Sequence, residues 1–238
     1  MKSLQAIFFD IDDTLCATSE FTQRARMDAI QAMIDIGLKL PKEYLWNELM
    51  EVIQEFTTNY SQHFDKLLLR IPPESYQHIN KAILVAVAVV AYHDAKKNYL
   101  KVYSDCIRLL DFLKPLPILK GIITEGFAVK QAEKLVRLNL YSYLDDQAIF
   151  ITDQIGISKT NPKIFQLICQ RCNILPENTL YVGDNPYKDI DSANASGIIT
   201  VRVRRGKYKE VDGKTNAVYD IQNLDELQTI VQKLIRKE

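Results

Sequence analysis

The feature that most constrains the fold is a short apolar run, Leu4 to Phe9, that breaks directly into Asp10-Ile11-Asp12-Asp13-Thr14. A β-prone run that ends in acids is typical of a buried strand carrying carboxylates to the rim of a sheet. In an open α/β sheet, ligands bind in the crevice beyond the carboxyl ends of the strands. Two carboxylates one residue apart repel each other in an apolar setting. We therefore expect them to hold a hard cation and to take part in chemistry beside it.

Length and charge exclude some classes of protein. The chain has 238 residues, enough for one large domain or for a core with a smaller second domain. Lys plus Arg and Asp plus Glu both number 30, so the formal charge is zero, which argues against a broad nucleic-acid-binding face. The basic run from Arg202 to Lys209 is interpreted as a solvated strand end and loop rather than an anion or partner site.

Cysteine usage and hydropathy predict a cytoplasmic protein that does not enter a membrane. The four cysteines are few for this length, and the first strand follows Met1-Lys2-Ser3 without an apolar leader. Cys169 and Cys172 have CxxC spacing but fall late in a helical pattern, which favours ordinary packing over zinc or redox use. The apolar stretch Ala82 to Tyr92 is shorter than the ~20 residues that span a bilayer. It predicts a helix buried in a bundle or at a subunit contact, so monomer and homodimer both stay open.

The segment 17–102 has helical patterning throughout. Thr18 or Ser19 is expected to cap a first helix, which ends at Gly37. Pro41 opens a second helix, a third covers Leu67 to Leu69, and a fourth runs from about Ser75 to Tyr99. No strand pattern interrupts them. We therefore predict a helical cap domain at 17–102, inserted after the first strand.

From Ser104 onward, predicted strands and helices alternate. The strands are expected at 118–123, 148–151, 179–182 and 198–203, with a short extended piece at 217–219. Helices separate them, one ending at Gly197 and the last beginning at Leu224. This rhythm predicts an α/β fold: a Rossmann-like, doubly wound parallel sheet covered on both faces. The core domain is then formed by 1–16 and 103–238.

Four of these segments end in polar residues whose order and spacing resemble the haloacid dehalogenase-like (HAD) hydrolases. The four matching stretches are Asp10-Ile-Asp12-Asp13-Thr14-Leu15, Gly121 to Gly126, Gly156 to Phe165 around Lys159, and Gly183 to Ile190. The helical insert lies between the first two, where subfamily IA carries its cap. Within the family the chain is most similar to Mg²⁺-dependent phosphatases best known from archaea, some described as glyceraldehyde-3-phosphate phosphatases.

The resemblance implies a role for each motif residue. Asp10 is the nucleophile that forms an aspartyl-phosphate, and Asp12 is the general acid and base. The carboxylates of Asp10 and Asp184, with the main-chain carbonyl of Asp12, would ligate Mg²⁺. Lys159 would neutralise charge on Asp10 and the phosphoryl group, and Asp189 would fix Lys159 or a metal-bound water.

The resemblance also implies a phosphate site. The Thr124 hydroxyl would bind phosphoryl oxygens, together with the Glu125 and Gly126 amides, which are expected at a helix start. Glu125 stands where relatives often have Asn, so its side chain is expected to point away from substrate. Lys163 is interpreted as a solvated residue and Asp13 as a support residue. Asp153 is expected at the surface and Asp191 on a solvated helix.

Several functions remain open at this point. The leading hypothesis is a phosphatase acting on a small phosphorylated metabolite, whose specificity comes from cap residues such as Arg24, Tyr92, His93 and Lys96. A phosphomutase shares all four motifs. A dehalogenase or phosphonatase would not be expected to keep Asp12, and a non-catalytic phosphate-binding or scaffold protein would not need all the motif residues.

Overall fold

The computed structural model describes residues 4–235, which divide into two compact units. One unit joins the start of the described chain, through Ser19, to the segment from Lys101 onward, and the other is Glu20–Leu100. A purely helical unit is thus inserted into the sequence of a unit that contains both strands and helices.

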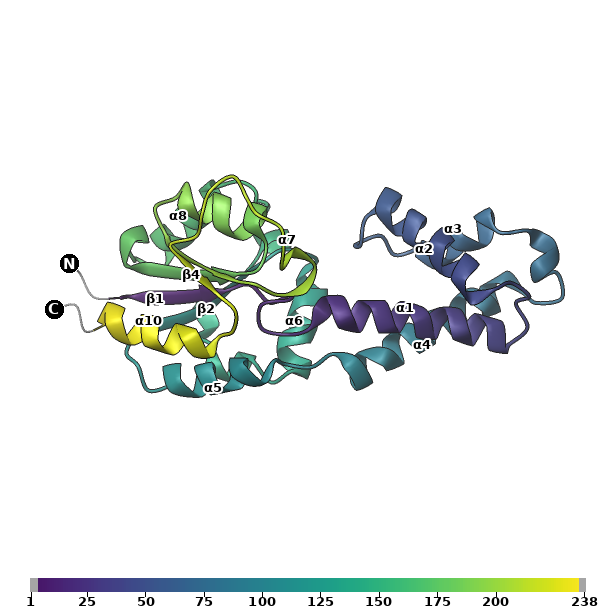
Figure 1. Cartoon of the computed structure of the whole chain (residues 1–238), viewed down its shortest axis with the longest axis horizontal. Helices are drawn as coiled ribbons and strands as arrows, with labels where there is room; N and C mark the ends of the chain where they lie inside the picture. The colour runs from purple at the N-terminus through teal and green to yellow at the C-terminus, as the bar shows by residue number, and fades with distance from the viewer. Residues whose placement is uncertain (1–3, 236–238) are drawn as a thin grey trace. The chain divides into compact units, whose positions relative to one another are not determined.

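The first unit contains a six-stranded parallel sheet in the order β3-β2-β1-β4-β5-β6 (Figure 1). The central strand β1 pairs with β2 on one side and β4 on the other, with Ala6 opposite both Leu119 and Thr179. All four residues of β1 are buried, as expected for a parallel strand covered on both faces. The strands are β1 Ala6–Phe9, β2 Leu119–Thr124, β3 Ile149–Ile151, β4 Thr179–Gly183, β5 Ile199–Val203 and β6 Tyr219–Ile221.

Helices cover both faces of this sheet, which confirms the predicted doubly wound fold. In Figure 1, α8 lies on one side of the strands and α5 and α10 lie on the other. Aromatic rings of Phe8, Phe150, Phe165 and Tyr181 pack into one core cluster. The helices are α5 Ser104–Leu113, α6 Ala128–Arg137, α7 Thr152–Ile155, α8 Lys163–Arg171, α9 Ser192–Asn194 and α10 Asp225–Ile235, with 3₁₀ turns at Tyr141–Tyr143, Asp146–Ala148, Pro176–Asn178 and Gly206–Tyr208.

The second unit is helical, as its sequence pattern predicts. Its elements are α1 Thr18–Asp35, which begins in the first unit, α2 Lys42–Phe56, α3 His63–Arg70, a 3₁₀ turn at Pro73–Ser75 and α4 Lys81–Tyr99. The predicted start of the fourth helix near Ser75 is wrong. The Asn80 side chain accepts a hydrogen bond from the Ala82 amide at 2.9 Å and caps α4, so the helix begins at Lys81.

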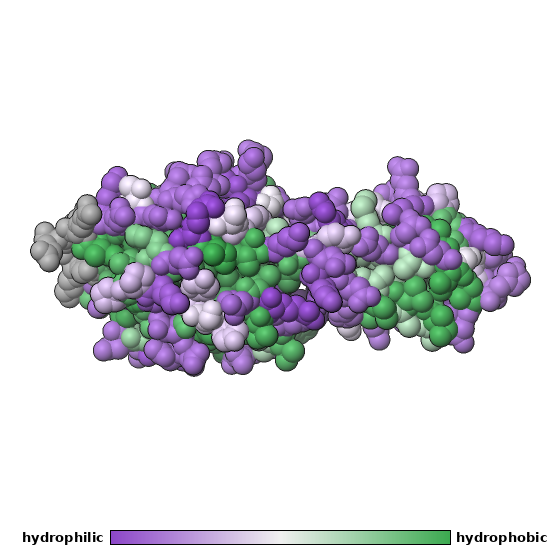
Figure 2. Space-filling view, turned by 90° about the horizontal axis from the view of Figure 1, so that it is seen from below, coloured by the Kyte–Doolittle hydropathy of each residue, from purple (hydrophilic) through white to green (hydrophobic). Residues whose placement is uncertain are grey.

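The apolar helix α4 is only partly buried. Leu84 and Ala88 lie in the core of the helical unit, whereas Ile83 is 56% exposed and Val90 is 59% exposed. Figure 2 shows apolar surface on the helical unit. Burial within the bundle therefore accounts for one face of α4, and the subunit contact stays a prediction. None of the helices in residues 4–235 is both long and apolar enough to cross a membrane.

Three further boundaries differ from expectation in the first unit. β6 begins at Tyr219 rather than Ala217, because the Val218 amide donates to the Thr200 hydroxyl at 3.1 Å instead of to the strand ladder. α1 begins at Thr18, so the two expected cap residues lie within its first turn, and the Ser19 amide donates to Asp13 Oδ1 at 2.8 Å. The single helix expected before Gly197 is a π-helix, Pro186–Asp191, followed by the short α9.

Candidate active site

Three carboxylates converge beyond the carboxyl ends of β1 and β4. Asp10 follows β1, and its amide donates to the Val182 carbonyl at 2.9 Å. Asp184 follows β4, and Asp189 lies on the π-helix that comes next. Carboxylate oxygens of the three residues lie within 4.8 Å of one another, and each residue is at most 5% exposed. The sheet therefore gathers three acids, separated by up to 179 positions in the sequence, in one buried cluster.

Lys159 holds two of these acids together. Its Nζ donates to Asp10 Oδ1 at 2.7 Å, to Asp189 Oδ1 at 2.5 Å and to the Tyr181 hydroxyl at 3.1 Å. The Tyr181 hydroxyl also lies 2.9 Å from Asp189 Oδ1. Of the two contacts expected for Asp189, the structure shows the one with Lys159. Lys159 therefore orients both carboxylates, but its single positive charge can balance only one of their two negative charges.

The charges of the cluster shift its pKa values strongly. Burial raises the pKa of Asp10 to about 7 against the opposing charge of Lys159, and the Asp189 charge adds to the rise. Burial, with the charges of Asp189 and Asp10, raises the pKa of Asp184 to about 9. Burial alone would lower the pKa of Lys159, but Asp10 and Asp189 raise it well above its usual value. Lys159 thus stays protonated, and the protein alone does not provide enough positive charge for three ionised carboxylates.

The free oxygens of this cluster suit a divalent cation. Both oxygens of Asp189 are occupied, Oδ1 by Lys159 and Oδ2 by the Asn185 amide at 3.0 Å. Within residues 4–235, the Asp184 carboxylate accepts no hydrogen bond, and Asp10 uses only Oδ1. Three carboxylates and one ammonium leave two negative charges when all are ionised. Hard oxygen donors with this residual charge fit Mg²⁺.

Asp12 lies outside the buried cluster. Its carboxylate accepts hydrogen bonds from Lys134 Nζ, from Thr18 Oγ1 at 2.6 Å and from Gln131 Nε2 at 3.2 Å. The side chain is 32% exposed. Burial tends to raise its pKa, but the Lys134 charge and these hydrogen bonds lower the pKa below the ordinary 3.8. Asp12 is therefore ionised at neutral pH in this arrangement.

The end of β2 provides an unsatisfied hydroxyl. Thr124 is fully buried, and its Oγ1 has no hydrogen-bond partner among the described residues. Because a buried polar atom without a partner costs ~1–3 kcal/mol, this hydroxyl is a candidate contact for a ligand oxygen. It lies on the strand next to Asp10, as expected.

The amides that follow Thr124 are arranged differently from expectation. The helix that follows them, α6, begins at Ala128, whose amide donates to Asp153 Oδ2 at 3.0 Å, so Glu125 and Gly126 lie in the turn before it. The Gly126 amide is not free either, since it donates to Thr152 Oγ1 at 3.2 Å. The Thr152 hydroxyl at the β3–α7 junction thus occupies one of the two amides that the sequence assigned to an anion.

Glu125 forms an ion pair across two motifs. Its Oε1 accepts from Lys188 Nζ on the π-helix at 2.8 Å, while its Oε2 is buried with no hydrogen-bond partner among the described residues. Lys188 therefore neutralises the unusual acid of the second motif. No sequence pattern indicated this ion pair.

The residues interpreted as supporting or solvated have distinct positions. Asp13 accepts hydrogen bonds from both the amide and the hydroxyl of Ser19, which makes it a support for the start of α1. Lys163 is exposed. Asp191 is not simply solvated, because it accepts from the Thr215 amide and hydroxyl, both at 2.7 Å, and so holds the loop before β6.

Comparison with known proteins places this geometry in a family. A family model described as haloacid dehalogenase-like hydrolase matches residues 4–197. The chain belongs to this hydrolase family. The match spans all four motifs, so it includes the sheet edge that gathers Asp10, Asp184 and Lys159.

Two curated relatives can be aligned with the hydrolase over almost its whole length. It is 42% identical to a glyceraldehyde 3-phosphate phosphatase from Methanopyrus kandleri, covering 98% of this chain and 99% of the relative. It is 36% identical to a protein of the same name from Methanocaldococcus jannaschii, covering 97% and 98%. These similarities place the hydrolase among the phosphatases of the family. The crystal structure of a putative β-phosphoglucomutase from Thermotoga maritima has the same fold, with a TM-score of 0.71, 21% identity and coverage of 97% and 99%.

Three residues that contact the predicted site residues of the hydrolase were not found from its sequence. Lys134 and Gln131 both contact Asp12, and Tyr181 contacts Lys159. Gln131 carried a detectable signal, because it lies one helical turn before the buried Leu135 and so puts a polar side chain on the apolar face of α6. Lys134 resembles any solvated helical lysine, and Tyr181 resembles any aromatic core residue of a strand.

The cap candidates lie in the helical unit. Arg24 pairs with Glu20 at 2.7 Å, and its guanidinium lies 5.4 Å from the centre of the Tyr99 ring. The Tyr92 ring contacts the rings of Phe21 and His93, at centroid distances of 5.9 and 6.0 Å. Any contact of these residues with substrate stays a prediction.

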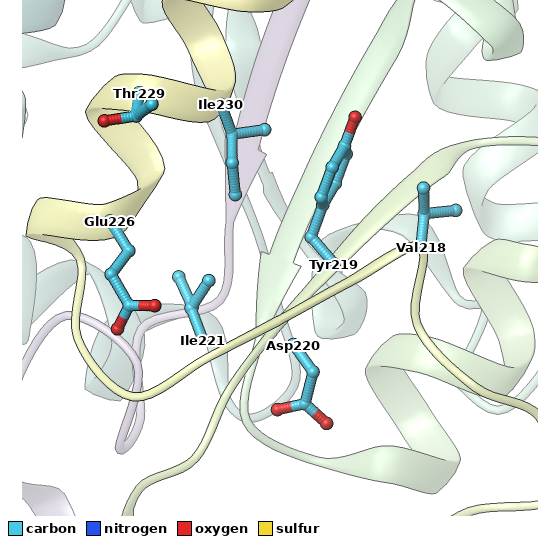
Figure 3. Close-up of a pocket in the computed structure, with 7 residues that line it drawn as sticks. All are labelled: Val218, Tyr219, Asp220, Ile221, Glu226, Thr229 and Ile230. Atoms are coloured by element: carbon cyan, nitrogen blue, oxygen red, sulfur yellow. The ribbon is translucent and has the colours of Figure 1, made fainter.

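A shallow pocket of about 480 Å³ lies between β6 and α10 (Figure 3). Its two acids already have partners. Asp220 pairs with Arg204 at 2.6 Å, and Glu226 accepts from the Gln222 amide at 3.0 Å. We interpret this pocket as a seam between a strand and a helix.

Proposed function

We propose that the protein is a Mg²⁺-dependent phosphatase that hydrolyses a small phosphate monoester through an aspartyl-phosphate on Asp10. The observation that carries the proposal is the buried cluster of Asp10, Asp184 and Asp189 around one Lys159 ammonium. Its residual charge calls for a divalent cation, and the unpartnered Thr124 hydroxyl lies on the adjacent strand. The two relatives named as glyceraldehyde 3-phosphate phosphatases support a triose phosphate as the substrate.

The metal would be held by the Asp10 and Asp184 carboxylates and the main-chain carbonyl of Asp12. Mg²⁺ prefers such oxygen ligands, keeps several waters and binds phosphate oxygens. When bound, it offsets the negative charge of the site and stabilises charge on the transferring phosphoryl group. The raised pKa values of Asp10 and Asp184 mean that metal and protons compete for the same oxygens.

In the first step, an Asp10 carboxylate oxygen attacks phosphorus. The new bond joins Asp10 to phosphorus, and the bond between phosphorus and the alcohol oxygen breaks. Asp12 takes up a proton from solvent when the phosphate dianion binds, and it gives this proton to that leaving oxygen. Lys159 keeps Asp10 oriented, because its Nζ lies 2.7 Å from Asp10 Oδ1.

In the second step, Asp12 acts as a base. It now carries a carboxylate, as it does in the free structure, and takes a proton from the water that attacks phosphorus. The bond between phosphorus and Asp10 breaks and inorganic phosphate leaves. Asp12 then releases the proton that it took from water to solvent, and both carboxylates are back in their starting state. The two steps replace one hydrolysis that is extremely slow without catalysis.

Binding of the phosphoryl group would use Thr124 and Lys159. The Thr124 hydroxyl donates to a phosphoryl oxygen, and Lys159 neutralises another. The Glu125 and Gly126 amides would add donors, provided that the Thr152 hydroxyl releases the Gly126 amide on binding. Asp189 positions Lys159 from behind and has no contact with substrate in this scheme.

The test is phosphate release from triose phosphates, sugar phosphates, nucleotides, phosphoglycolate and an aryl phosphate, with Mg²⁺ and with EDTA. We expect metal-dependent release that disappears in Asp10→Asn and persists in Asp146→Asn, which removes an exposed acid of the same unit. Absence of release from folded, Mg²⁺-loaded protein would contradict a phosphatase. Strict dependence on a bisphosphate activator would instead indicate a phosphomutase.

A further inference from the structure

Asp12 is held by donors from α6, an element that has no part in the motif that carries Asp12. Lys134 Nζ and Gln131 Nε2 reach opposite oxygens of its carboxylate, with Thr18 Oγ1 on the same oxygen as Lys134. Lys134 is charged and Gln131 is only 5% exposed. Buried or partly buried donors of this kind fix a carboxylate far better than solvent does.

Gln131 also ties Asp12 to the second motif. Its Nε2 donates to the Glu125 carbonyl at 3.0 Å as well as to Asp12 Oδ2 at 3.2 Å. Its Oε1 accepts from Lys134 Nζ at 3.3 Å, so the lysine fixes which end of the amide faces Asp12. One side chain thus sets the distance between the general acid and the loop that follows Thr124.

Gly126 makes room for this bridge. Its φ is +142°, and a Cβ at this position would lie 2.7 Å from Gln131 Nε2. Any other residue would push the amide away from Asp12 and would also strain the backbone. The glycine of the second motif is therefore required by the Gln131 bridge as well as by its own turn.

We propose that Lys134 and Gln131 are positioning residues that hold Asp12 where it exchanges protons with the leaving alcohol and the attacking water. The inference rests on the proposed phosphatase function. General acid catalysis contributes roughly 10²–10⁴-fold, and a displacement of about 1 Å can cost ~10²-fold. The loss of rate arises only in the proton-transfer step. Its size therefore depends on how strongly departure of the leaving group requires a proton.

The experiment compares kcat/KM for an alkyl phosphate, glycerol 3-phosphate, with kcat/KM for 2,4-dinitrophenyl phosphate, whose leaving group needs no proton. Because kcat/KM reports steps up to the first irreversible one, slow hydrolysis of the phosphoenzyme does not affect it. Lys134→Met is expected to lower kcat/KM for the alkyl phosphate about 100-fold and kcat/KM for the dinitrophenyl ester less than about 3-fold. Gln131→Leu is expected to act in the same direction, and Lys134→Arg to recover part of the loss.

Two controls separate positioning from a general defect. Lys163→Met removes an exposed lysine on another helix of the same unit, α8, and is expected to leave both values unchanged. In an Asp12→Asn background, Lys134→Met is expected to have no further effect on the alkyl substrate, because the residue that it positions is already inactive. Mg²⁺ affinity, measured by calorimetry, is expected to stay within about 3-fold of wild type, because the Asp12 carboxylate is not a metal ligand.

The outcomes are distinct. Equal losses for both substrates, or a Lys134→Met loss that persists in the Asp12→Asn background, would overturn the positioning role while the phosphatase function stands. Failure of wild type to hydrolyse either ester would overturn the proposed function itself. If Lys134→Met does not fold, Lys134→Arg and Gln131→Leu carry the same comparison.

Discussion

Asp10 and Asp12 follow the same strand with one residue between them, yet their carboxylates lie in opposite environments. Asp10 is 5% exposed and shares Lys159 with Asp189, and burial raises its pKa to about 7. The Asp12 side chain is 32% exposed and is held by Lys134, which helps lower its pKa. Asp10 directly follows β1, whereas Asp12 precedes a turn in which Asp13 has a φ of +55°, so the chain does not keep the strand alternation that would place both acids on one side.

The difference would let one short motif supply the two chemical roles that we propose for Asp10 and Asp12. A carboxylate buried beside other acids is held in a fixed place, and it stays ionised only when nearby cations offset the negative charges around it. A carboxylate at the rim can meet water and exchange protons with it. Pairs of acids whose environments move their pKa values apart are typical of divided catalytic roles.

Lys159→Met should give the largest effect on this contrast. It removes the only ammonium of the buried cluster among the described residues, so activity should fall at least about 10³-fold. Loss of one partner of a buried ion pair should also lower the free energy of unfolding by about 3–5 kcal/mol. Phosphate release and urea unfolding measure the two effects. Lys163→Met, which removes an exposed neighbour, should change neither, and a similar loss in both variants would contradict the assignment.

Asp184→Asn should separate activity from stability. It removes a proposed ligand, so Mg²⁺ affinity in calorimetry should drop at least about 100-fold and activity should follow. It also removes a buried carboxylate that accepts no hydrogen bond among the described residues, so the metal-free variant should melt at a higher temperature than wild type at pH 8. A lower melting temperature with unchanged Mg²⁺ affinity would show that Asp184 is a structural residue.

The melting temperature should depend on pH in the direction that the buried acids set. The folded pKa values of Asp10 and Asp184 lie above the ordinary 3.8, at about 7 and about 9. Their stabilising contribution is complete below the ordinary pKa and is lost as pH rises through those values. Metal-free protein should therefore melt at progressively lower temperature from pH 5 to pH 9, and the rise caused by Mg²⁺ should grow over the same range. A flat profile without metal would argue against the buried cluster.

The pair of Glu125 and Lys188 should give the smallest effect. Both side chains are partly exposed, so either single substitution should change stability by less than about 1 kcal/mol. Glu125→Gln should lower KM for a phosphate ester a few-fold by removing a negative charge, and Lys188→Met should raise it a few-fold. Steady-state kinetics at low ionic strength measures both shifts, and shifts of the same sign would contradict the electrostatic explanation.

The sequence was most informative where chemistry and strand ends coincide. The carboxyl ends of parallel strands meet at one edge, so Asp10, Thr124 and Asp184 could be expected there, and the family resemblance assigned them to one site. Lys159 was found through the spacing of its motif, and its contacts with Asp10 and Asp189 are those that the assigned position requires.

The remaining features depend on contacts that local patterns do not specify. Lys134 lies 122 positions from Asp12, and nothing in an amphipathic helix distinguishes a lysine that reaches an active site from a solvated one. The π-helix after Asn185 was also missed, because its start is set by the Asn185 side chain, which accepts from the Tyr187 and Lys188 amides. That wide turn places Asp189 on Lys159.

The central claim is that Asp10 becomes phosphorylated while Asp12 acts as the general acid and base. Trapping the phosphorylated intermediate tests it most directly. Asp12→Asn is mixed with Mg²⁺ and 2,4-dinitrophenyl phosphate, quenched in acid, digested and examined by mass spectrometry. The account predicts a phosphoryl group on Asp10, accumulating because hydrolysis of the phosphoenzyme lacks its base, and no such group in Asp10→Asn. A phosphoryl group on another residue, or turnover of the ester with an unmodified Asp10 at every quench time, would contradict it.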